Sequence, residues 1–165
     1  MRFLGRKGSL YDILYMGIVM FVFCMLVLVG YALYSQFDDQ VQAHGDIPAN
    51  AKTASTAIKS HFPGVMDGVS IFLLGVMTIG VLAMAVLIRV HPIFILFFLI
   101  FLIFFVFFCG IWANVYYEMA SNPELSAYAS DLTNMHYIMT YLPFIIGIIG
   151  FLLAVVMFKS WQVSG

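Results

Sequence analysis

The side chains of this chain that could carry chemistry are four histidines, two cysteines and eight acidic residues, spread over 165 residues. A metal site needs several ligands that converge with supported geometry. Asp131 and His136 lie five residues apart, and His44, His61 and Glu118 could approach them from the same side. No His-x-x-x-His or Glu-x-x-His spacing occurs. The pattern therefore predicts no metal centre and no bound cofactor.

The cysteines and serines also lack the spacing of a catalytic site. Cys24 and Cys109 both lie in long apolar stretches, and the chain contains no Cys-x-x-Cys pair. We expect both to be buried thiols rather than a disulfide or a redox pair. No Gly-x-Ser-x-Gly sequence and no phosphate-binding glycine loop is present. The sequence thus assigns no catalytic residue and indicates a protein that is not itself an enzyme.

The composition places these residues in a membrane protein. The chain is 64% hydrophobic and only 9% charged, which is more apolar surface than a soluble domain of this size can bury. Four segments reach the roughly 20 apolar residues that a transmembrane helix requires. They are residues 13–37, 69–88, 92–115 and 135–158. The sequence predicts an all-α integral membrane four-helix bundle that forms a single domain.

The two longer loops, residues 38–68 and 116–134, are each expected to carry one short extramembrane helix. In the first loop, Asp46 or Asn50 can cap a helix that Pro63 and Gly64 would end. This weakly amphipathic helix either lies on the headgroups or bundle, or docks a partner, and both readings stay open.

The second loop has its own helix signals. Asn122 followed by Pro123 is typical of a helix start, and the helix is expected to run to about Ser130. Asp131 or Asn134 can then cap the fourth span. Within that span, Pro143 predicts a kink.

Lysine and arginine counts predict the orientation, because cytoplasmic loops carry an excess of these residues. Five of the seven lie before the first span, between spans two and three, or after span four: Arg2, Arg6, Lys7, Arg89 and Lys159. Both termini are therefore expected on the cytoplasmic or equivalent side, although the count is small and the inverted orientation stays open. Trp112, Tyr116 and Tyr117 are expected to anchor the outer interface, where amphipathic rings are favoured.

Small residues predict where the helices pack, because they let backbones approach closely. The candidates are Gly68, Gly75 and Gly80 in span two and Gly147 and Gly150 in span four. They favour span two as the centre of the bundle. The third span is apolar around its whole circumference and rich in phenylalanine, so we expect it to be peripheral, facing lipid or another copy.

The spans carry essentially no ionisable residue at mid-depth, although such residues are the usual mark of transport or proton relay. A transporter or proton channel is therefore disfavoured. The basic N-terminal residues are most simply an orientation signal, and no specific nucleic-acid binding is predicted.

Three stretches carry a resemblance to a group of proteins: KGSLYDILYMGIVMFVF, IRVHPIFIL and GIWANVYYEMASNPEL. In this order of features the chain resembles small multi-span membrane proteins of viruses and phages, including those with an internal lipid membrane. The resemblance covers nearly the whole chain and implies a structural or host-envelope role. It brings no catalytic residues with it.

Three functions follow as hypotheses. The first is a non-enzymatic structural or scaffolding protein of a larger assembly, such as a virion membrane, contacting lipid, other membrane or coat proteins and further copies. The second is an accessory subunit of a membrane enzyme complex. The third is a holin-like pore-forming protein, which the lack of a polar helix face disfavours.

Overall fold

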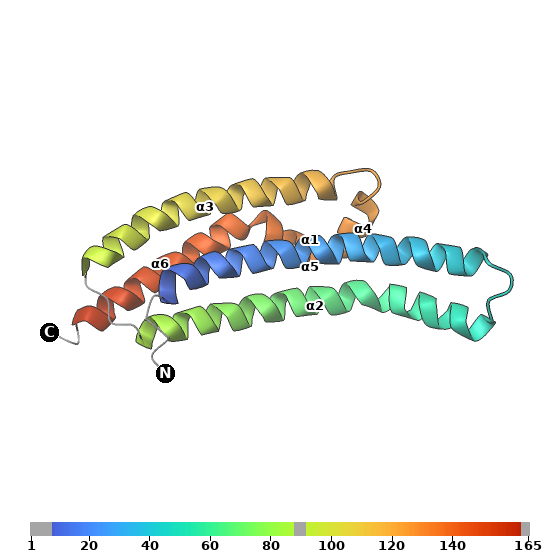
Figure 1. Cartoon of the computed structure of the whole chain (residues 1–165), viewed down its shortest axis with the longest axis horizontal. Helices are drawn as coiled ribbons and strands as arrows, with labels where there is room; N and C mark the ends of the chain where they lie inside the picture. The colour runs from blue at the N-terminus through green and yellow to red at the C-terminus, as the bar shows by residue number, and fades with distance from the viewer. Residues whose placement is uncertain (1–7, 88–91, 163–165) are drawn as a thin grey trace, which may run out of the picture.

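The fold is entirely helical in the part of the chain that the structure describes. The computed structural model describes residues 8–87 and 92–162. Six helices follow one another (Figure 1): α1 Gly8–Ala43, α2 Ala49–Leu87, α3 Pro92–Ala120, α4 Ser126–Asp131, α5 Thr133–Thr140 and α6 Leu142–Gln162. α1, α2, α3 and α6 are each long and apolar enough to cross a membrane. The predicted all-α four-helix bundle is confirmed.

The four long helices run alongside one another and define two ends of the molecule (Figure 1). The beginning of α1 and the end of α6 share one end, which we call the terminal end. The turn between α1 and α2 and the short helix α4 lie toward the other end, which we call the loop end. Side chains that meet at the loop end therefore come from helices far apart in the sequence.

The first long loop of the prediction is instead mostly helix. α1 continues to Ala43, and α2 begins at Ala49 and passes through Pro63 and Gly64 without a break. The short helix expected before Pro63 is the beginning of α2 itself. A proline inside a helix costs one backbone hydrogen bond, about 3 kcal/mol. Contacts on both sides of Pro63 hold α2 in place: Lys59 before it pairs with Asp38 of α1, and Asp67 after it accepts hydrogen bonds from α5.

The second long loop holds a short helix, as expected, but this helix, α4, begins at Ser126 and not near Asn122 and Pro123. The fourth span is divided. α5 and α6 are separated by Tyr141, and Pro143 lies in the first turn of α6. The backbone N–H of Ile145 still donates to the carbonyl of Tyr141 at 2.9 Å across this division. The helix is interrupted at Tyr141, two residues before Pro143, where the sequence predicted a kink.

The centre of the bundle is formed by α1 and α6 rather than by α2, which corrects the prediction. Met16, Met20 and Leu28 are fully buried on α1, and Ile146 and Leu153 are fully buried on α6. A smaller share of the apolar part of α2 is buried than of α1 or α6. Bulky side chains at three- and four-residue spacing, rather than small ones, build this core.

The glycines explain why α2 is peripheral. A Cβ atom added at Gly68, Gly75 or Gly80 would meet no atom of the described residues within 4 Å, so none of the three lies at a close helix contact there. At Gly147 it would make an ordinary contact with Val106, and at Gly150 it would overlap the side chain of Leu102. A glycine allows close packing only on a face that meets another helix. Gly150 does so, and the three on α2 do not.

A close approach that the sequence did not suggest occurs at Gly17 in α1. A Cβ there would lie 2.8 Å from Cζ of Phe105 in α3. Phe105 meets the ring of Trp112 edge-on at 5.9 Å between centroids, and Trp112 stacks on Phe21 at 5.6 Å. This aromatic group joins α1 to α3, because the missing side chain at position 17 leaves room for a ring.

α3 keeps one apolar stripe in the bundle and exposes the rest. Phe98 and Phe105 are buried, whereas five phenylalanines are exposed: Phe94, Phe97, Phe104, Phe107 and Phe108. The third span is thus peripheral in the single chain, as expected. Its exposed rings face whatever surrounds the bundle, and in a membrane protein the nearest medium is lipid.

We expect Gly150→Ala to destabilise the bundle by about 1–3 kcal/mol, because the new methyl group would force the buried side chain of Leu102 out of place. Gly75→Ala is the matched control: the same methyl meets open space there, and stability should stay the same or rise by up to about 1 kcal/mol through helix propensity. Unfolding in mixed micelles, followed by circular dichroism, measures both. Equal effects of the two changes would contradict the close packing at Gly150.

Candidate functional site

The most unusual polar group in the structure is the buried carboxylate of Asp67 in α2, which is only 8% exposed. Its two oxygens accept hydrogen bonds from the backbone N–H groups of Asn134 and Met135, each at 3.0 Å. Both donors lie in the first turn of α5. Ser70, which is also fully buried, donates its hydroxyl to the carbonyl of Asp67 at 2.8 Å.

Asp67 acts as the N-terminal cap of α5, although it belongs to α2. A capping residue normally lies in the same segment, just before the helix that it caps. The first N–H groups of a helix have no partner inside it, and a side chain just before the helix usually accepts from the second or third of them. The residue before α5 is Leu132, which offers no such acceptor. The prediction that Asp131 or Asn134 caps the fourth span is therefore wrong. A carboxylate from α2 takes that place, and its negative charge also suits the positive end of the helix dipole.

Asp131 has a different partner, which forms a second connection at the loop end. The hydroxyl of Tyr31 in α1 donates to Oδ2 of Asp131 at 2.9 Å. The Tyr31 ring stacks on Phe62 of α2 at 5.3 Å and meets Tyr128 of α4 edge-on at 5.6 Å. One buried tyrosine therefore ties α1, α2 and α4 together, and its hydroxyl bonds the Asp131 carboxylate.

Two buried polar atoms beside Asp67 have no hydrogen-bond partner among the described residues: the hydroxyl of Tyr116 and Nδ1 of His136. The two rings contact each other with centroids 5.9 Å apart. Tyr116 and Cys24 both lie within electrostatic range of Asp67. Four helices, α1, α2, α3 and α5, thus contribute polar groups to one level of the bundle, which we call the polar layer: Cys24, Asp67, Tyr116 and His136.

The polar layer joins helices: Asp67 of α2 accepts hydrogen bonds from α5, and Tyr116 of α3 contacts His136 of α5. Within residues 8–87 and 92–162, no three His, Cys, Asp or Glu side chains converge as metal ligands. Cys24 and Cys109 are both free and buried, as expected. The chemistry that the arrangement supports is the fixing of one helix by another.

The predicted interface anchors divide into three groups. Tyr117 and Lys159 are exposed and Trp112 is half-buried. Tyr116 is fully buried, so it is a core residue and not an anchor. The remaining four lie outside the residues whose placement the structure describes: Arg2, Arg6, Lys7 and Arg89.

Sequence reasoning missed Asp67 because it placed the residue in a loop after Pro63 and Gly64. A signal was present in the spacing: Asp67, Ser70, Leu74 and Val81 follow one another at the intervals of a single helix face. Because α2 is continuous, this face packs against the bundle, and Asp67 and Ser70 are both buried. The spacing could not show which groups would meet it.

Replacement of Asp67 tests the cap. We expect Asp67→Ala to lower stability by about 1–3 kcal/mol, because two buried N–H groups lose their acceptor. Asp67→Asn should cost less, since the amide oxygen can still accept one of the two bonds. Hydrogen exchange at Asn134 and Met135, measured with global unfolding, should accelerate in both variants. Asp39→Asn, a change at an exposed carboxylate, is the control and should leave this exchange unchanged.

Two tyrosines provide a second test with opposite expectations. Tyr31→Phe removes a hydroxyl that donates to Asp131 and should cost about 1 kcal/mol. Tyr116→Phe removes a buried hydroxyl that has no partner among the described residues, so stability should stay the same or rise. Thermal unfolding of the two variants in one detergent compares them directly. A clear loss for Tyr116→Phe would show that this hydroxyl makes a bond of its own.

Comparison with known proteins yields no relative for this chain. No family model matches it, and neither a curated protein nor a solved structure matches it at a significant level. The function is therefore argued from the contacts and surfaces of the chain itself.

Proposed function

We propose that the chain is a non-enzymatic structural protein of a larger membrane assembly, such as a virion membrane. In this proposal the bundle is a rigid membrane anchor, and the extension of α1 and α2 at the loop end holds a partner protein. The observation that carries the proposal is this extension, which we call the arm: residues 33–43 of α1 and residues 49–60 of α2.

The arm reaches beyond the rest of the bundle. α1 has 36 residues and α2 has 39. At 1.5 Å per residue they are about 54 and 58 Å long, whereas the hydrocarbon core is about 30 Å thick. Figure 1 shows both helices continuing past α4 and the end of α3. A membrane span alone does not require this length.

Polar contacts between its two helices hold the arm in one shape. Lys59 forms ion pairs with Asp39 at 2.8 Å and with the buried Asp38 at 3.5 Å. The side-chain amide of Gln42 donates to the carbonyl of Lys52 at 3.1 Å, and Nζ of Lys52 donates back to the carbonyl of Gln42 at 2.8 Å. Several linked contacts fix a geometry better than one exposed ion pair does.

The arm also exposes apolar side chains. Tyr31 stacks on Phe62 and meets Tyr128 of α4, the helix predicted to lie outside the membrane. The residues after Tyr31, which the sequence placed in span one as far as residue 37, and those before Phe62 therefore lie nearer the tip. Leu33, Phe37 and Ile58 in this part are 61%, 56% and 54% exposed. Leu33 and Phe37 are four residues apart on α1 and share one face. Exposed apolar groups on a rigid element are typical of a protein contact surface.

The interior of the bundle favours an anchor over a pore. An ion pathway requires polar or charged groups along its length. The fully buried side chains of α1 and α6 below the polar layer are apolar, among them Met16, Met20, Ile146 and Leu153. This packing supports a structural role over the holin-like alternative.

The test is mild extraction of the native membrane or particle, followed by intact mass and identification of co-migrating proteins. We expect a stoichiometric partner that is lost from the double variant Leu33→Glu and Phe37→Glu. Phe104→Glu and Phe151→Glu would disturb insertion, so the control is Phe104→Leu with Phe151→Leu, which should keep the partner.

Three results would overturn the proposal. A homogeneous homo-oligomer without a partner that leaks dye from vesicles would indicate a pore. Co-migrating subunits with haem or metal would indicate an accessory role in an enzyme complex. A partner that binds the arm variant as well as the unmodified chain would show that the arm is not the docking element.

A further inference from the structure

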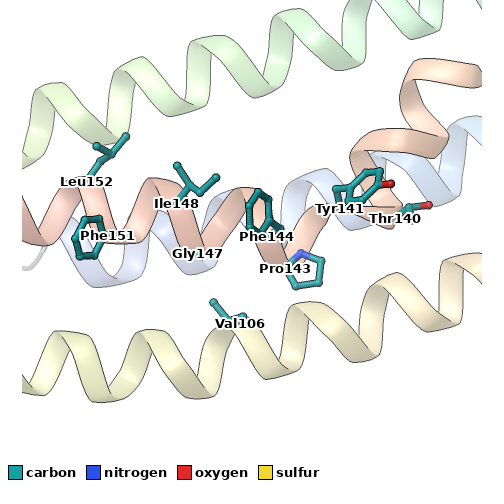
Figure 2. Close-up of a pocket in the computed structure, with 9 residues that line it drawn as sticks. All are labelled: Val106, Thr140, Tyr141, Pro143, Phe144, Gly147, Ile148, Phe151 and Leu152. Carbon is teal, nitrogen blue, oxygen red and sulfur yellow. The ribbon is translucent and has the colours of Figure 1, made fainter.

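We draw no further inference here: the strongest candidate, the apolar groove of about 610 Å³ on the outside of the bundle between α3 and α6 (Figure 2), carries none because nothing in the structure shows what covers it.

Discussion

The interaction on which the loop end depends is the pair of hydrogen bonds from α5 to the Asp67 carboxylate. A buried charge is costly unless it is paired or hydrogen-bonded, and the first N–H groups of a helix are costly unless they find an acceptor. Here the Asp67 carboxylate provides the acceptor that the N–H groups of α5 need, and these N–H groups provide the hydrogen bonds that the buried carboxylate needs. Because only Tyr141 separates α5 from α6, fixing the first turn of α5 also sets where α6 begins. Tyr31 and Asp131 add a second connection, from α1 to α4, so four helices are linked at the loop end.

Toward the terminal end, the helices are held together by close packing of their side chains. Lipid is as apolar as the side chains it replaces, so helices in a membrane associate through close packing rather than a hydrophobic drive. Gly17 under the Phe105 ring and Gly150 under Leu102 provide that closeness. The two modes complement each other: hydrogen bonds fix which helices meet, and packing fixes how closely they approach. Above the polar layer, ion pairs and amide contacts keep the arm in shape.

The two outward features differ in what they offer. The arm presents apolar side chains on a rigid pair of helices beyond α4, and we propose a protein partner there. The α3–α6 groove presents an apolar surface with the hydroxyl groups of Thr140 and Tyr141 at one end (Figure 2). The proposal for the arm describes a protein that organises its surroundings without chemical turnover.

Hydropathy is a local property, and the sequence by itself therefore determined the all-helical class, the four apolar spans and the buried thiols. The sequence favoured α2 as the centre of the bundle, because the spans are apolar on every face. Composition cannot distinguish a glycine at a helix contact, such as Gly150, from one without a close neighbour, such as Gly75. The sequence also ended a helix at Pro63, because the contacts with α1 and α5 that hold α2 in place come from other segments. Asp67 and the helix it caps are 67 and 68 residues apart in the sequence. Only the tertiary structure decided that pairing, because a carboxylate and a helix start without a cap meet through packing and not through spacing.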